Sequence, residues 1–86
     1  MAWRVEFTRT AEKQMAKLDR QVQRAILDYL RKRVRANPRQ LGKPLRGDKK
    51  GLWRYRVGDY RLICDMKDDV TTVLVLASGH RKEVYR

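Results

Sequence analysis

The chain has 86 residues, of which 42% are hydrophobic, and this suits one small folded domain rather than a disordered basic tail. It carries 22 lysines and arginines against 10 acidic residues, so its formal net charge is +12. A charge of this size attracts polyanions, and nucleic acid or an acidic protein is the expected partner. One histidine, one cysteine and scattered carboxylates make no metal-ligand set, so we expect no metal and no cofactor.

The N-terminal residues MAWRVEFTR contain no hydrophobic signal core, and the longest apolar run, Val73 to Ala77, is far too short to span a membrane. The single cysteine, Cys64, excludes an internal disulfide and fits a reducing compartment. We therefore expect a soluble, cytoplasmic protein whose residues 1–86 form one domain, with no membrane partner.

The first half of the chain predicts one short strand and two helices. Over residues 2–7 apolar and charged side chains alternate, which is typical of an amphipathic strand. Thr8 or Thr10 can cap a short helix, and Asp19 a second one that ends before Asn37-Pro38. The apolar stripe of the first helix is Ala11, Met15 and Leu18, and the face of the second is Val22, Ile26, Tyr29, Leu30, Arg33 and Val34.

Residues 37–51 hold both prolines and three of the five glycines, which predicts a loop-rich connector. Its basic residues Arg46, Lys49 and Lys50 are candidate contacts for an RNA backbone. Basic residues on the outer faces of the two predicted helices are by default solvated and contribute solubility more than a site.

The stretch Leu52 to Met66, LWRYRVGDYRLICDM, predicts a β-hairpin with a two-residue type II′ turn at Gly58-Asp59. This turn sets Val57 opposite Tyr60 and Arg56 opposite Arg61. The apolar face would then consist of Trp53, Tyr55, Val57, Tyr60, Leu62 and Cys64.

The other face of this hairpin gathers Arg54, Arg56 and Arg61. Like charges directly opposite one another destabilise a sheet unless an anion neutralises them, and a phosphate is the obvious anion. The alternative is that the three arginines coat a solvated face and splay apart in water.

After a second turn at residues 67–69, the apolar residues 70–77 predict an interior strand, and the tail SGHRKEVYR is expected to leave the sheet near the three arginines. The fold class is therefore α+β: a short N-terminal strand, a helical hairpin, then a three-strand antiparallel meander, with the helices packed on one face of the sheet.

This order of elements, the connector NP followed by GKPLRG, the hairpin WRYRVGDYRLICDM and the ending GHRKEVY together resemble the RelE family of toxin-antitoxin ribonucleases, over essentially the whole chain. The resemblance implies a ribosome-dependent endoribonuclease that cuts mRNA in the A site of the small subunit. It also implies a cognate antitoxin that holds the toxin inactive.

The resemblance carries the family's basic site residues onto Arg54, Arg56, Arg61 and Arg81, and its terminal tyrosine onto Tyr85. Three features depart from the best-known member: arginine replaces a lysine pair at Arg54 and Arg56, His80 replaces a lysine, and no C-terminal helix follows. Arginine keeps its proton at neutral pH, which argues against proton transfer of a lysine type.

RNA cleavage by the 2′-OH needs charge stabilisation, which arginine forks provide, and proton transfer, which they do not. His80 alone titrates near neutrality and is the candidate acid or base, unless it is merely a turn histidine exposed to water. Tyr85 is expected to stack on a nucleobase or to act as the general base that accepts a proton. The alternative is that it packs back on the sheet.

Two other functions stay open. The related ParE-type toxins share the scaffold and inhibit DNA gyrase without cutting RNA. A plain RNA- or DNA-binding domain would show salt-dependent binding and no product.

Overall fold

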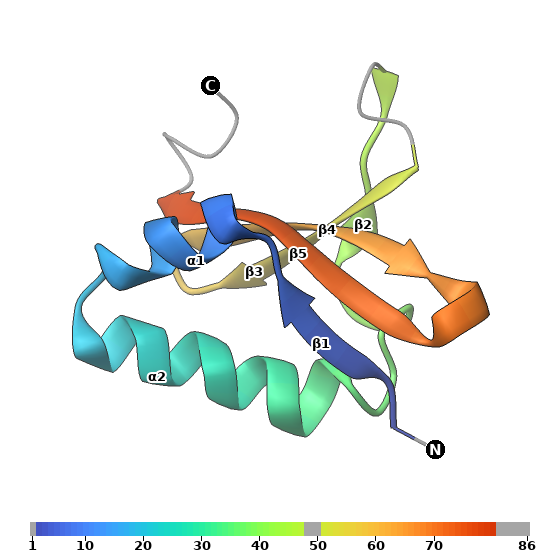
Figure 1. The fold of residues 1–86 in the computed structure, drawn as a ribbon, viewed down its shortest axis with the longest axis horizontal. Helices are drawn as coiled ribbons and strands as arrows, with labels where there is room; N and C mark the ends of the chain where they lie inside the picture. Colours follow the sequence, from blue (N-terminus) through green and yellow to red (C-terminus); the bar gives the residue numbers. More distant parts are fainter. Residues whose placement is uncertain (1, 48–50, 81–86) are drawn as a thin grey trace.

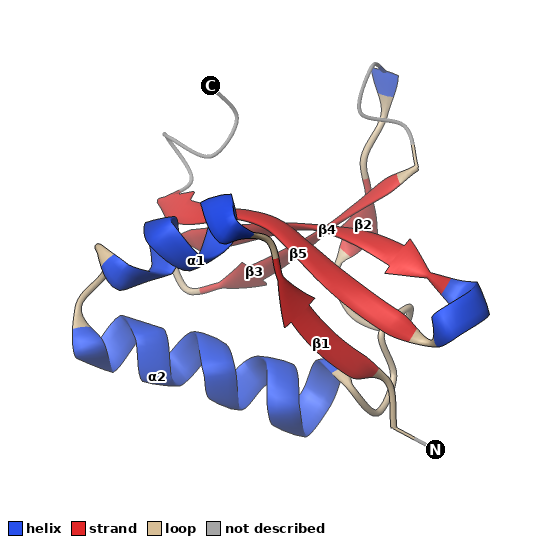
Figure 2. Ribbon diagram, viewed as in Figure 1, coloured by secondary structure: helices blue, strands red, loops and turns tan. Residues whose placement is uncertain are grey.

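The structure is a computed structural model and describes residues 2–47 and 51–80. Within these residues five strands form one sheet in the order β1-β5-β4-β3-β2, with the helices packed on one face (Figures 1 and 2). The helices are α1 (Arg9–Ala16) and α2 (Arg20–Tyr29), and α2 runs into a π-helical turn, η1 (Leu30–Val34). The strands are β1 (Arg4–Phe7), β2 (Lys43–Pro44), β3 (Leu52–Val57), β4 (Tyr60–Lys67) and β5 (Thr72–His80), and a 3-10 turn, η3 (Asp68–Val70), joins the last two. The predicted α+β class is confirmed.

Helix α1 begins directly after β1 because Thr8 serves both elements. Its backbone N–H donates to the carbonyl of Val75 at 3.0 Å, which extends the parallel pairing of β1 with β5. Its hydroxyl oxygen accepts a hydrogen bond from the Ala11 N–H at 3.1 Å and so caps the helix. Of the two candidate caps, Thr8 is therefore the one used. Asp19 stands at the N-cap of α2, as predicted, but its side chain makes no capping hydrogen bond.

The core lies between the helices and the sheet. Ile26, Leu30 and Val34 follow one another at spacings of four along α2 and η1 and are at most 1% exposed. Each such buried side chain contributes roughly 1.5–3 kcal/mol. Across from them lie the buried sheet residues Tyr55, Leu62, Cys64, Val73 and Val75. In the part of the chain that the structure covers, no helix is long and apolar enough to cross a membrane.

The β3–β4 hairpin has the predicted register, with Val57 paired to Tyr60 and Arg56 to Arg61. Gly58 has φ +60°, as the first loop position of a type II′ turn requires. Cys64 is fully buried on the helix side, and this burial raises the pKa of its thiol. The division of the hairpin into an apolar and an arginine face is confirmed.

Residues 37–51 were predicted to be a loop-rich connector, and the described part of this segment is mostly loop, but it also contains a strand that was not predicted. They contribute the two-residue strand β2, which pairs Lys43 with Arg54 and Pro44 with Trp53. Two side chains of β3 tie this segment down: the Trp53 indole donates to the carbonyl of Leu41 at 2.7 Å, and the Tyr55 hydroxyl donates to that of Pro38. A glycine and a proline flank Lys43 in the sequence, and this pattern predicts a loop instead of a strand.

The prediction that the chain leaves the sheet at Ser78 was wrong, because β5 continues to His80. The Ser78 N–H donates to the side-chain oxygen of Gln14 at 2.8 Å, which anchors the strand to α1. In this register Gly79 lies opposite Arg61 and His80 opposite Tyr60. The interior position of β5, between β1 and β4, is as the apolar sequence predicted.

Candidate functional site

On the sheet surface turned away from the helices, β2, β3 and the start of β4 carry a group of four basic residues, which we call the basic face: Lys43 on β2, Arg54 and Arg56 on β3, and Arg61 on β4. Tyr55 points into the core, so its neighbours on β3 point away from it. Lys43 lies opposite Arg54, and Arg56 opposite Arg61. Each like-charged pair destabilises the sheet. Two such pairs on one face are an arrangement that a bound polyanion stabilises.

Arg61 is the most buried member of the basic face, at 8% exposed, whereas Arg56 opposite it is exposed. On the other flank β5 presents Gly79, which has no side chain. No described atom lies within 4 Å of the point where a Cβ on Gly79 would stand. A covered guanidinium samples few orientations, and among the described residues the space beside Gly79 is open. Arg61 is therefore suited to act as a preorganised donor to an oxyanion.

His80 lies away from this cluster. Its ring packs edge-on against Tyr60, with 5.8 Å between the ring centroids and 83° between the planes. Because side chains alternate along a strand, Tyr60 and His80 share the side of the sheet that carries Leu62, while Arg61 points to the other side. The structure thus brings Arg54, Arg56 and Arg61 together, and sets His80 beside Tyr60 at the end of β5.

The remaining predicted site residues fall into two groups. Arg46 is exposed just beyond β2, and the N–H of the preceding Leu45 donates to the carbonyl of Leu52 at 2.9 Å, which holds this segment beside β3. The others lie outside the described residues, so their assignments stay predictions; they are Lys49, Lys50, Arg81 and Tyr85.

No role for Lys43 was predicted from the sequence, although it is one of the basic residues of the connector. The missing information was its partner: only the pairing of β2 with β3 shows that Lys43 stands opposite Arg54. The motif GKPLRG gives only a weak indication: Pro44 restricts the preceding Lys43 to an extended backbone.

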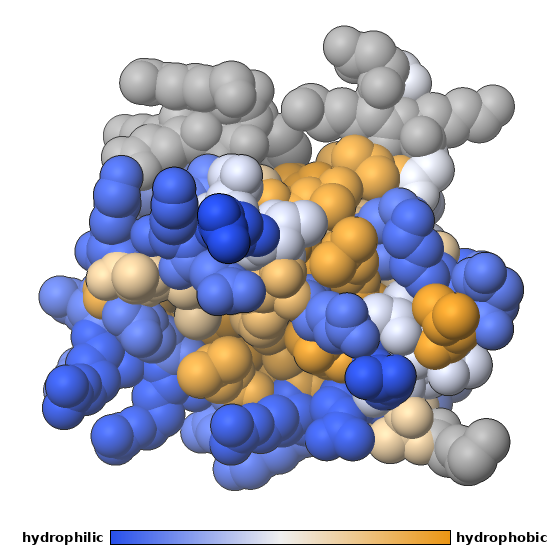
Figure 3. All heavy atoms as spheres, in the orientation of Figure 1, coloured by the Kyte–Doolittle hydropathy of each residue, from blue (hydrophilic) through white to orange (hydrophobic). Residues whose placement is uncertain are grey.

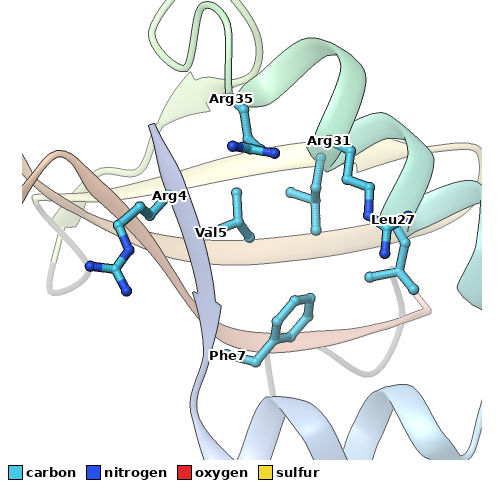
Figure 4. Close-up of a pocket in the computed structure, with 7 residues that line it drawn as sticks. Arg4, Val5, Phe7, Leu27, Arg31 and Arg35 are labelled. Atoms are coloured by element: carbon cyan, nitrogen blue, oxygen red, sulfur yellow. The ribbon is translucent and has the colours of Figure 1, made fainter. Parts of the chain in front are cut away.

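A separate groove of about 370 Å³ lies between β1 and α2. Val5 and Phe7 point from β1 toward Leu27 on α2, and Arg31 and Arg35 stand at the edge of the groove (Figure 4). Figure 3 shows apolar surface in the middle of this face, framed by hydrophilic side chains. The described residues therefore present a basic face on the open side of the sheet and, separate from it, an apolar groove on the helix side.

Metal ligands do not gather in the described part of the chain, where no three His, Cys, Asp or Glu side chains come together. What the basic face does supply is fixed positive charge. Arginine guanidiniums bind phosphate oxygens through two parallel hydrogen bonds and stay charged at any physiological pH. The site is thus equipped to bind a phosphodiester and to stabilise added negative charge on it.

Comparison with known proteins identifies relatives along the whole chain. Residues 5–85 match the family model described as the ParE toxin of the type II toxin-antitoxin system parDE. Toxin RelG of Mycobacterium tuberculosis is 35% identical over 86 residues, covering 100% of this chain and 99% of the relative. Toxin RelE of the same organism is 32% identical and covers 98% of this chain and 87% of the relative.

Solved structures agree with these sequence matches. The toxin-antitoxin complex RelBE2 from Mycobacterium tuberculosis contains a chain that matches with a TM-score of 0.89 and 33% identity, covering 94% of this chain and 100% of that one. The isolated E. coli RelE toxin matches with a TM-score of 0.78 and 28% identity, over 98% and 92% of the two chains. The chain therefore belongs to the RelE/ParE superfamily of type II toxin-antitoxin toxins.

Proposed function

We propose that this toxin is a ribosome-dependent endoribonuclease that cleaves mRNA in the A site and so inhibits translation. The observation that carries the proposal is the pair Arg56 and Arg61, which face one another on the open side of the sheet with Arg61 largely covered. Relatives named RelE and RelG support it, and a shaped phosphate site is what such an activity needs.

In the proposed reaction the 2′-OH of one nucleotide attacks the adjacent phosphorus, and the 5′ oxygen of the next nucleotide leaves. The products are a 2′,3′-cyclic phosphate and a 5′-OH. Arg56 and Arg61 stabilise the additional negative charge on the phosphorane, with Arg81 as a further donor. The attacking hydroxyl must lose a proton and the leaving oxygen must gain one, and arginine performs neither step. Tyr85, His80 or groups of the ribosome then transfer the protons, which accounts for the dependence on a ribosome.

The test uses purified toxin, ribosomes programmed with a defined mRNA, and single-turnover conditions. Arg61→Ala should lower the cleavage rate by about 10²-fold or more, the scale of losing a preorganised donor. Arg61→Lys retains the positive charge but loses the planar guanidinium that donates two parallel hydrogen bonds, so its cleavage rate should also be low. Lys32→Ala, on the exposed surface of η1, is the matched control and should cleave at the wild-type rate. If the mRNA stays intact with the wild-type toxin, the proposal is wrong. If Arg61→Lys cleaves at the wild-type rate, Arg61 contributes only its positive charge and not the geometry of its guanidinium.

The position of His80 beside Tyr60 gives its proposed role a test of its own. If the imidazole transfers a proton, His80→Gln should change the pH profile of the single-turnover rate. A profile that is unchanged in His80→Gln assigns the proton transfer to Tyr85 or to the ribosome.

Inhibition of DNA gyrase without RNA cleavage is the second candidate, because the family model that matches the chain is that of the ParE toxins. A gyrase supercoiling assay run beside the ribosome assay separates the two functions. Gyrase inhibition with intact mRNA would establish the ParE-type activity.

We also propose that a cognate antitoxin neutralises this toxin in the cytoplasm, as the complexes of related toxins suggest. An amphipathic segment with acidic residues fits the groove between β1 and α2: its apolar side chains would contact Phe7 and Leu27, and its carboxylates Arg31. Co-expression of the antitoxin should relieve growth arrest by the toxin. Leu27→Asp should weaken the complex strongly and Lys13→Glu, on α1, should not. Equal binding by both variants would place the antitoxin elsewhere.

A further inference from the structure

At the edge of the basic face a notch of about 240 Å³ lies between the end of α2 and strands β2 and β3. We call it the β2 notch, and it is lined by Tyr29, Gly42, Lys43, Arg54 and Arg56. Three of these five residues are cationic and none is acidic. The volume is below the roughly 300–1,000 Å³ of pockets that enclose whole small molecules, so the notch suits a fragment of a longer ligand.

The backbone is shaped to place Lys43 here. Gly42, with φ +67°, passes so close to β3 that a Cβ on it would stand 2.2 Å from the carbonyl oxygen of Arg54. The preceding carbonyl, that of Leu41, accepts a hydrogen bond from the Trp53 indole at 2.7 Å. Lys43 is thereby fixed opposite Arg54, as the second like-charged pair of the face. Holding two cations together costs stability, and an anion between them removes this cost.

The notch continues the row of cations that begins at Arg61. Arg56 stands opposite Arg61 and also lines the notch, and Arg54 follows it on the same side of β3, about 7 Å further along at a rise of ~3.4 Å per residue. Neighbouring phosphates of a single strand are separated by a comparable distance. A strand whose cleaved phosphate lies at Arg56 and Arg61 therefore brings its next phosphate to Arg54 and Lys43.

We propose that the β2 notch binds the phosphodiester next to the one that is cleaved, with Lys43 and Arg54 as its ligands and the Tyr29 ring as its wall. The assignment rests on the proposed endoribonuclease function. It gives Lys43 a role in binding the message, not in the chemical step. Tyr29 keeps its place in the wall because it packs edge-on against Tyr55, with 6.2 Å between the ring centroids.

The test compares Lys43→Ala, Lys43→Arg and the control Lys13→Ala in ribosome-dependent cleavage at several salt concentrations. Lys43→Ala should raise the half-saturating concentration several-fold, leave the single-turnover rate at saturation unchanged, and reduce the slope of log affinity against log salt by about 0.7–1. Lys43→Arg should restore the slope, and Lys13→Ala should match the wild type. If Lys43→Ala behaves as the wild type while the wild type cleaves, the notch assignment is wrong and the proposed function stands.

Two further arms identify the phosphate. With an mRNA carrying one neutral methylphosphonate at the neighbouring position, Lys43→Ala should have no additional effect; an equal loss on both mRNAs would assign Lys43 to ribosomal RNA and overturn the proposal. Without ribosomes, the dinucleotide pUpU should shift the amide NMR signals of Gly42 and Lys43 in the wild type but not in Lys43→Ala. If the wild type does not cleave and pUpU still shifts these signals, the phosphate site stands and the endoribonuclease function fails. Absence of any shift counts against the site.

Discussion

Gly42→Ala tests whether the close approach of β2 to β3 requires glycine. The new Cβ would lie 2.2 Å from the Arg54 carbonyl oxygen, 2.8 Å from the Trp53 indole nitrogen and 2.9 Å from a ring carbon of Tyr55. The left-handed backbone at φ +67° costs a non-glycine residue about 1–2 kcal/mol, and overpacking against rigid neighbours adds about 1–3 kcal/mol. The free energy of unfolding should therefore fall by about 2–5 kcal/mol, a large share of the ~5–15 kcal/mol that stabilises a domain.

Gly58→Ala is the matched control for this substitution. Gly58 also has a positive φ, +60°, but no atom of the described residues lies within 4 Å of its Cβ position, so Gly58→Ala incurs the backbone cost alone. Urea unfolding followed by tryptophan fluorescence measures both variants. Gly42→Ala should be less stable than Gly58→Ala by about 1–3 kcal/mol. Equal stabilities would refute the claim that β2 is packed against β3 at this point, and with it the fixed position of Lys43.

Three other predictions concern stability and are checked by the same unfolding assay. Thr8→Ala removes the α1 cap and should cost about 1 kcal/mol, whereas Asp19→Ala, which removes no capping hydrogen bond, should cost less; the reverse order would contradict the assignment of the caps. Leu30→Ala should cost about 2–5 kcal/mol and Val70→Ala, at a residue 57% exposed, less than ~0.5 kcal/mol. Burial raises the pKa of Cys64, so the folded state favours the neutral thiol, and stability present at neutral pH should be lost as the pH rises above the ordinary value of 9.0. Cys64→Ala should lessen this decline, and an unchanged decline would show that Cys64 does not contribute to it.

Local patterns alone predicted most of the elements. The alternation around Gly58 predicted the register of β3 and β4, because a two-residue turn leaves one pairing that buries the apolar side chains. The spacing of Ile26, Leu30 and Val34 predicted the buried face of the second helix, since hydrophobic periodicity reflects burial directly. Because the two-residue turn at Gly58 sets the register, Arg56 and Arg61 were also predicted to face one another.

Tertiary structure decided the features that depend on residues far apart in the chain. The pairing of Lys43 with Arg54 arises from hydrogen bonds of Trp53 and Tyr55 to the connector, which no local pattern encodes. His80 was expected near the arginines, but the continued pairing of β5 with β4 sets it beside Tyr60 instead. Whether a two-residue strand forms, and toward which face of the sheet the side chains at the end of a strand point, both depend on long-range hydrogen bonds. These hydrogen bonds form only once the sheet is assembled.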